Sequence, residues 1–461
     1  MSAGNTQRKL QAAVVGMGAV LVLAAPAAAA ETPTFSKDVA PILQAKCQSC
    51  HQPNSIAPMS LMTFQEARPW ARSMKERVSS RQMPPWHIDK SVGIQSFQND
   101  MSLSDEQIDT IVRWVDGGAP QGDPKDLPPA VPPVTTNEWR GVTNGFGPPD
   151  VVIKSSEYTM PAQHQDVWYR PTSDIPITEP RWIRMVEIRP SNLRARKTLH
   201  HSVAYQVLSP DNVQAVNTGI APGPSSVSAD DAVNRRPMIM EWAIGKGYDR
   251  YRDDTGKLLM PGEKISWDQH IHAVGEEIPT GSELGIWFYP KGQEPKKRSY
   301  LVAFTGIDRT KMLDIPPNSI AHTEGFTVLK ENTMITNFQP HFHLRGKAME
   351  VEAILPDGNK QLISYVGNFN FNWMTNYIYA DDAAPVFPKG TVIHVAAYYD
   401  NTTANKNNPD PEQWVGYGDR TVDEMAHAWV NVFYLSDDEY NQIVEERKAK
   451  TQRNTQQQQQ Q

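Results

Sequence analysis

The pattern of apolar and polar residues changes once along the chain. Up to about residue 126, apolar residues recur three and four positions apart, a spacing typical of amphipathic helices. From residue 138 onward, apolar and β-branched residues come in short runs separated by Gly, Pro, Asn and Asp, which is typical of antiparallel strands. The chain therefore predicts a small helical part followed by a much larger β part.

Three helices are expected in the first part, residues 31–126. The first covers Phe35–Lys46, and the second covers Thr63–Arg81 with a break at Pro69. Ser104 opens a capping box at the start of the third helix, which ends at a Gly-Gly pair. These helices are short, so they predict a small all-α domain.

The second part contains too many strands for one sandwich of ordinary size. We expect two antiparallel β-sandwiches of the jelly-roll kind, residues 138–307 and 308–448, with the break near Asp308–Pro317. The residues after them, 449–461, end in glutamines and predict a disordered polar tail. The expected strands are Val151–Ile153, Ile183–Ile188, Ser202–Leu208, Leu284–Tyr289, Leu301–Phe304, Phe326–Leu329, Ala348–Ile354, Gln361–Val366, Thr391–Tyr399 and Ala428–Leu435.

The first 30 residues have the features of a secretory signal peptide. Arg8 and Lys9 precede an apolar run, and Ala28-Ala29-Ala30 supplies a cleavage site. We therefore expect a periplasmic or secreted protein with no stable membrane span after cleavage; an uncleaved anchor is the alternative. A second segment without a fold of its own, residues 127–137, is a proline-rich linker between the helical and β parts.

The net charge and the cysteine content limit the kinds of partner and cofactor that the chain is expected to bind. The formal net charge of −7 gives no basic field for nucleic acid, so no nucleic-acid partner is expected. The chain has only two cysteines against 12 histidines and 17 methionines. Both cysteines lie in Cys47-Gln48-Ser49-Cys50-His51, the attachment motif of c-type haem.

This motif predicts one covalently bound haem c. Cys47 and Cys50 are spaced to form thioethers with its two vinyl groups, and His51 is placed to bind the iron. With helices on both sides of the motif, residues 31–126 resemble a class I cytochrome c. Met83, which precedes two prolines, is the expected sixth iron ligand, as in the Met-Pro of small cytochromes c; the alternatives are Met59, Met62 and His87.

Histidine clusters mark the β part. Residues two apart on a strand share a face, so His270-Ile271-His272 and His341-Phe342-His343 each suit one metal ion. The adjacent pair His200-His201 shares a metal only at a bulge, a strand end or an edge. A fourth cluster, Asp423-Glu424-Met425 with His427, adds a thioether. Imidazole and thioether without thiolate favour copper, with zinc as the alternative.

The order of these clusters resembles the copper type II, ascorbate-dependent monooxygenases, the family of the peptidylglycine and dopamine β-monooxygenases. The resemblance covers most of residues 145–437. It implies two coppers per chain: an electron-transfer copper on His200, His201 and His272, for which His270 is a second candidate, and an oxygen-activating copper on His341, His343 and Met425.

The resemblance also implies a reaction. A C–H bond of a small-molecule or peptide substrate would be hydroxylated with O2, and a periplasmic donor or an ascorbate-like reductant would supply electrons through the haem. No motif fixes the substrate. The alternatives are a copper and haem electron-transfer or copper-binding protein without oxygenase activity, and an oxidase that releases peroxide. We expect Arg345 to make a structural ion pair, and His394 and His427 are candidates to orient the ligands.

Overall fold

The computed structural model describes most of the chain. The described residues are 32–53, 57, 59–131, 138–208, 238–243, 246–308, 313–418 and 420–459. The signal peptide predicted for residues 1–30 therefore lies outside the described residues, and so does the linker from residue 132 to residue 137.

The helical part begins with a π-helical turn that runs into α1 and contains the expected break in its second helix. Pro69 lies in the 3-10 turn η2, between α2 and α3, and capping boxes start α2 at Thr63 and α4 at Ser104. Phe35, Leu43 and Trp114 are almost fully buried where these helices meet. The helices are η1 (Phe35–Val39), α1 (Ala40–Lys46), α2 (Phe64–Ala67), η2 (Arg68–Trp70), α3 (Ala71–Ser79) and α4 (Asp105–Asp116).

The first pair of sheets encloses one apolar core. Its strand orders are β1-β12-β5-β9-β13, with β8 on β5, and β3-β10-β6-β7, with β4 on β10; β11 and β2 form a separate ribbon. The strands are β1 (Val151–Lys154), β2 (Tyr158–Met160), β3 (Val167–Tyr169), β4 (Thr172–Asp174), β5 (Arg181–Pro190), β6 (Leu199–Val207), β7 (Met238–Ala243), β8 (Tyr248–Arg250), β9 (Thr255–Leu259), β10 (Lys264–Ile271), β11 (Ile278–Thr280), β12 (Ser282–Phe288) and β13 (Lys297–Arg298). The short helices η3 (Pro124–Asp126), α5 (Arg140–Thr143) and η4 (Arg194–Arg196) lie between these elements along the chain.

The second pair of sheets encloses another core. Its orders are β21-β18-β25-β17-β22, with β14 on β25, and β16-β23-β19-β20; β15 and β24 form a ribbon. The strands are β14 (Tyr300–Thr305), β15 (Asp314–Ile315), β16 (Ile320–Val328), β17 (Asn332–Ile335), β18 (Asn337–His341), β19 (Gly346–Ile354), β20 (Lys360–Val366), β21 (Tyr377–Ile378), β22 (Val386–Phe387), β23 (Val392–Asp400), β24 (Val415–Gly416) and β25 (His427–Leu435).

A mostly β architecture with several sheets is thus confirmed, and a strand forms at each of the ten predicted places. One boundary differs. Strand β14, which the predicted boundary at residue 307 assigns to the first sandwich, pairs with β25 in the second. The turn residues near position 308 mark a change of strand, whereas the change of sandwich comes before Tyr300.

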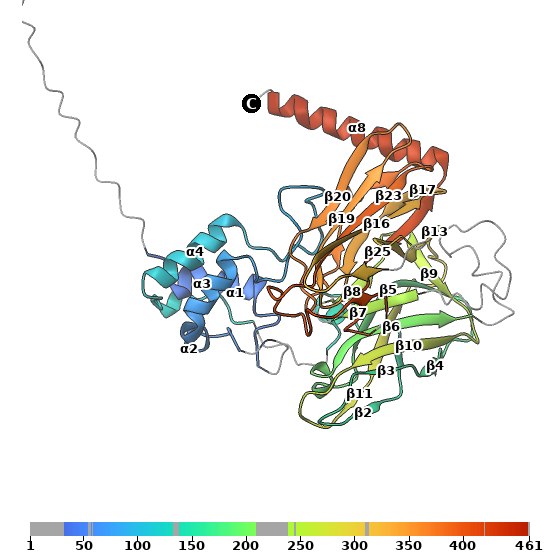
Figure 1. The fold of residues 1–461 in the computed structure, drawn as a ribbon. Helices are drawn as coiled ribbons and strands as arrows, with labels where there is room; N and C mark the ends of the chain where they lie inside the picture. Colours follow the sequence, from blue (N-terminus) through green and yellow to red (C-terminus); the bar gives the residue numbers. More distant parts are fainter. Residues whose placement is uncertain are drawn as a thin grey trace, which may run out of the picture.

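Helices α1–α4 gather on one side of the β part (Figure 1). They are joined to it by an extended arm, residues 84–99, between α3 and α4. Asp89 donates its N–H to the carbonyl of Tyr365 (2.8 Å), and Ile94 donates to Ile363 (2.9 Å). Trp86 packs edge-on against Tyr377, with ring centroids 4.7 Å apart, and is 5 % exposed within the second core. Part of the predicted helical domain is therefore built into the second sandwich.

The C-terminal residues form a helix where the sequence predicts a disordered tail. Helix α8 runs over Asp437–Gln459 and projects along one end of the β part (Figure 1). Its last turns are exposed, and their Gln, Lys and Arg residues have good intrinsic helix propensity. Within the described residues, no helix is both long enough and apolar enough to span a bilayer.

Candidate metal centre

A bulge brings the adjacent histidines of the first sandwich together. In the pairing of β6 with β10, His270 lies opposite His201 and Ile271 opposite Leu199, so His200 is an extra residue. A bulge re-aims side chains that would otherwise point to opposite faces. The ring nitrogens of His200, His201 and His270 all lie within 4.8 Å of one another, as a shared metal ion requires.

His270 therefore joins the pair in the place where the family resemblance implies His272. The Nε2 atom of His270 lies 2.7 Å from a carboxylate oxygen of Asp166, and its ring stacks on Trp168 with centroids 4.2 Å apart. Asp166 thus orients the ring of His270, as carboxylates commonly do for ligating histidines. His272 is half-buried, with its ring centroid 6.2 Å from that of His200.

Two single variants separate these assignments. His270→Ala should release the metal of the first site, because it removes one of three converging imidazoles. His272→Ala is the matched control, two residues away on the same segment, and should keep that metal. Copper per chain after dialysis measures both. Loss of copper in His272→Ala alone would reverse the assignment.

Burial keeps His200 and His201 of the first site neutral. Desolvation, and then the nearby His270 and His272, lower the pKa of His200 to about 3. The Nε2 atom of His200 is buried and has no hydrogen-bond partner among the described residues. A neutral imidazole whose ring nitrogen makes no hydrogen bond can bind a metal ion, because the binding nitrogen must be deprotonated.

His341 and His343 lie at the end of β18, and their Nδ1 atoms are already used. Nδ1 of His343 lies 3.0 Å from the carbonyl oxygen of Asp423. Nδ1 of His341 lies 3.2 Å from the sulfur of Met374, which is fully buried. These contacts favour the tautomer that leaves Nε2 of each ring for a metal. His427 pairs with His341 across the strands, with ring centroids 6.1 Å apart.

The loop before β25 fixes this pair. The fully buried carboxylate of Glu424 accepts the backbone N–H groups of His343, Arg345 and Met425. Desolvation by burial raises the pKa of Glu424 to about 7. The buried guanidinium of Arg345 donates to Asn401 and to the carbonyls of Val422 and Asp410. Arg345 thus has the expected structural role, although its guanidinium bonds to an amide and two carbonyls.

The structure brings the thioether of Met374 and the backbone of Met425 to this region. Met425 is half-buried and follows Glu424, so its backbone lies beside His343. Met374 was not singled out from the sequence, because its segment has no ligand motif and reaches His341 only through the fold. Met425 remains the predicted ligand of the second metal, whereas Met374 orients His341.

The two histidine sets meet at the boundary between the sandwiches. The ring centroids of His201 and His341 are 6.3 Å apart. Phe371 of the second sandwich stacks on His200 at 4.3 Å and lies 6.3 Å from His343. The hydroxyl of Thr421, from the second sandwich, lies 3.1 Å from Nε2 of His270. The two sets thus form one continuous cluster.

The haem motif follows α1 directly. Cys47 and Cys50 are free thiols, and burial raises the pKa of Cys47 to about 12. Nδ1 of His51 lies 3.2 Å from the carbonyl oxygen of Met59, which favours Nε2 as the free ring nitrogen. The backbone carbonyl of Met59 thus lies on the Nδ1 side of the His51 ring, away from an iron that would bind at Nε2. This position argues against Met59 as the sixth ligand.

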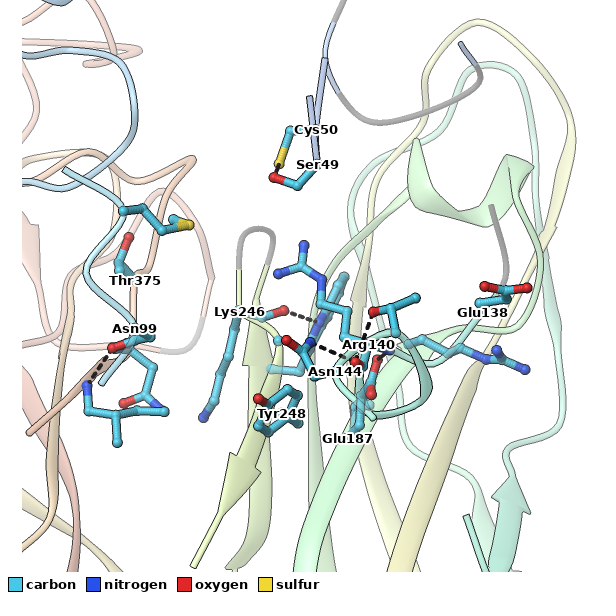
Figure 2. Close-up of a pocket in the computed structure, with 18 of the residues that line it drawn as sticks. Ser49, Cys50, Asn99, Glu138, Arg140, Asn144, Glu187, Lys246, Tyr248 and Thr375 are labelled. Atoms are coloured by element: carbon cyan, nitrogen blue, oxygen red, sulfur yellow. Dashed lines mark hydrogen bonds between the residues drawn. The ribbon is translucent and has the colours of Figure 1, made fainter. Parts of the chain in front are cut away.

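Two cavities adjoin the haem segments. One, of about 460 Å³, has Ser49 and Cys50 on one wall and faces Lys246 and Thr375 of the β part (Figure 2). The other, of about 490 Å³, is lined by Met83 and His87. Both of these candidate sixth ligands are half-buried, so Met83 stays the prediction and His87 the alternative.

The chain matches no protein-family model and no curated protein. Among solved structures it is similar to N-glycanase F, at 10 % identity and a TM-score of 0.29, over 62 % of this chain and 96 % of that one. It is also similar to the VP2 subviral particle of infectious bursal disease virus, at 10 % identity and a TM-score of 0.18, over 64 % and 77 %. TM-scores this low carry no argument about fold or function.

Proposed function

We propose that this protein is an exported copper-dependent monooxygenase that hydroxylates a C–H bond with O2 and receives electrons through a covalently bound c-type haem. The proposal keeps the resemblance to the ascorbate-dependent copper monooxygenases and to class I cytochrome c. The observation that carries it is the meeting of two histidine sets, one from each sandwich, with 6.3 Å between the rings of His201 and His341.

The donor chemistry fits copper. Each set offers a neutral imidazole, that of His200 in the first and that of His341 in the second, and the thioether of Met374 lies beside the second set. Borderline nitrogen and soft sulfur ligands suit an ion that alternates between Cu(II) and Cu(I). His200, His201 and His270 would hold one copper, and His341, His343 and Met425 would hold the other. When bound, copper supplies the reduction of O2 that the hydroxylation needs.

The haem motif fits its group as well. Cys47 and Cys50 are unpaired and lie at the end of a helix, and the contact of His51 with Met59 leaves Nε2 for iron. A haem held between histidine and methionine suits electron transfer rather than oxygen binding. The proposed hydroxylation consumes two electrons per turnover, and the haem would supply them one at a time.

The remaining residues prepare the site. Asp423 and Met374 set the ring orientations of His343 and His341, and Asp166 sets that of His270. Phe371 stacks on His200. These contacts within the chain would hold the rings in place for the metals.

Metal and oxygen measurements on the full-length protein test the proposal. We expect one haem and two coppers per chain, O2 uptake that depends on reductant and substrate, and loss of activity in Met425→Ala. Met260→Ala, at a half-buried methionine after β9, is the control and should keep activity.

One haem with less than one copper per chain, or unchanged activity in Met425→Ala, would contradict the proposal. Copper binding without O2 uptake under any substrate would favour the alternative of an electron-transfer or copper-binding protein. Stoichiometric peroxide release would favour an oxidase.

A further inference from the structure

The arm, residues 84–99, follows Met83 directly and contains His87, and these two residues are candidate sixth haem ligands. It is hydrogen-bonded to the segment of the second sandwich that contacts His341. Thr375 donates its hydroxyl proton to the carbonyl of Pro85, with 3.0 Å between the oxygens. The arm residue His87 donates its N–H to the hydroxyl of Tyr377, at 3.2 Å. These two hydrogen bonds join the chain on the C-terminal side of Met83 to the segment Met374–Tyr377.

That same segment contacts the metal-binding histidine. Met374 precedes Thr375, is fully buried, and places its sulfur 3.2 Å from Nδ1 of His341. Pro85 lies two residues beyond Met83. Covalent bonds and two short contacts therefore join Met83 to His341 through Pro85, Thr375 and Met374.

A second observation, the cavity beside Cys50, also leads to Thr375. The cavity below Cys50 has Thr375 on its far wall (Figure 2). A haem joined to Cys50 would have its thioether edge at this cavity. Thr375 thus faces the haem-binding region from the side of Cys50 as well as from the side of Met83.

We infer that electrons from the haem enter at the second sandwich, through the segment Met374–Thr375 to His341, and not first at the His200, His201 and His270 set. The inference rests on the proposed function. In the step, one electron leaves ferrous haem, which becomes ferric, and one cupric ion held by His341 and His343 becomes cuprous. No bond breaks and no proton moves.

The first sandwich offers a competing route. Trp242 also lines the cavity, and its neighbour Ala243 pairs with His201 across the strands. Among the described residues, no hydrogen bond or ring contact joins Cys50 to Trp242 along that route. The Pro85, Thr375 and Met374 route is continuous in bonds and contacts, and so it is favoured.

The test follows haem reoxidation in the full-length protein, loaded with haem and Cu(II) and kept anaerobic. A light flash reduces the haem, its absorbance reports reoxidation, and electron paramagnetic resonance reports loss of the cupric signal. We expect fast reoxidation to persist in the double variant His200→Ala/His201→Ala. We expect it to be lost in His341→Ala/His343→Ala.

Single variants test the route itself. Thr375→Val removes the hydroxyl but keeps the shape, and should slow reoxidation several-fold, while Thr375→Ser should restore the rate. Thr391→Val is the matched control, because the buried Thr391 also donates to a proline carbonyl, that of Pro388, away from the route. It should leave the rate unchanged. The haem spectrum and circular dichroism show that each variant is folded.

The outcomes separate the inference from the proposed function. Reoxidation that is lost in His200→Ala/His201→Ala and kept in His341→Ala/His343→Ala would overturn the inference and assign entry to the first sandwich. An unchanged rate in Thr375→Val would overturn the route. A protein that binds haem but no copper would overturn the proposed function, on which the inference depends.

Discussion

Glu424→Ala should loosen the loop around His343 and remove metal from the second site. The variant leaves three backbone N–H groups without their acceptor, those of His343, Arg345 and Met425. Two of these donors, those of His343 and Arg345, are buried. Each buried donor without a partner costs about 1–3 kcal/mol, so the variant should lose at least about 2 kcal/mol of stability. His343 and Met425, both predicted ligands, would lose the contact that holds their backbones in place.

Denaturant unfolding and copper per chain measure this effect. Glu331→Ala, at an exposed glutamate of the same sandwich, is the control and should change neither quantity. Glu424→Gln keeps a carbonyl acceptor and the side-chain volume, and its loss should be intermediate. Wild-type stability and copper content in Glu424→Ala would show that the buried carboxylate does not hold the loop.

The metal-free protein should lose stability as the pH falls below about 6.5, the ordinary pKa of histidine. Burial lowers the pKa of His200 to about 3, and it lowers the pKa values of His201 and His341 well below the ordinary value. All three rings stay neutral in the folded chain and become protonated in the unfolded chain. A depressed folded pKa therefore gives stability that is lost on acidification, at roughly 1.4 kcal/mol per pH unit for each ring.

Glu424 acts in the opposite direction. Burial raises its pKa from 4.5 to about 7, so its contribution to stability grows as the pH falls from 7 to 4.5. It offsets one of the three histidines in this window, so these four groups together give a net loss of roughly 2.8 kcal/mol per pH unit. Below pH 4.5 the contribution of Glu424 is constant, and the loss should become about one and a half times as steep.

Denaturation midpoints at stepped pH values, after removal of copper by a chelator, measure this profile. His200→Asn removes one of the three titrating rings and should reduce the slope between pH 6.5 and pH 4.5 by roughly 1.4 kcal/mol per pH unit. His164→Gln, at an exposed histidine, should leave it unchanged. Copper should protect the wild-type protein in the same window, because the metal competes with protons for the rings. A flat wild-type profile would contradict the assignment of neutral buried histidines.

Local patterns in the sequence predicted the elements well. The capping box at Ser104, the break at Pro69 and each of the ten strand positions follow from the spacing of apolar residues and from turn residues, which act over a few positions. The His-x-His motifs were found for the same reason. On a strand, the period of two alone puts both rings on one face.

Features that depend on distant pairing could not be predicted in this way. Nothing near Tyr300 states that β14 pairs with β25, and nothing near Leu199 states that β6 contains a bulge. The choice between His270 and His272 depends on that bulge. Met374 and Thr375 gain their roles only because the fold brings His341 and Pro85 to them. The short helices of residues 35–116 do not by themselves show a cytochrome c fold, which stays a prediction from the haem motif.

The arm has a consequence for the order of biogenesis. Residues 84–99 find their partners in residues 363–381, which are synthesised some hundreds of residues later. Since chains emerge from the N-terminus, Trp86 and Phe97 lack their contacts with Tyr377 and Tyr379 until the second sandwich is made. In a chain that takes up the proposed haem, this delay would leave the segment around Cys47 and Cys50 accessible to the machinery that attaches the haem until the arm docks. Haem attachment would thus come before the metal sites are complete.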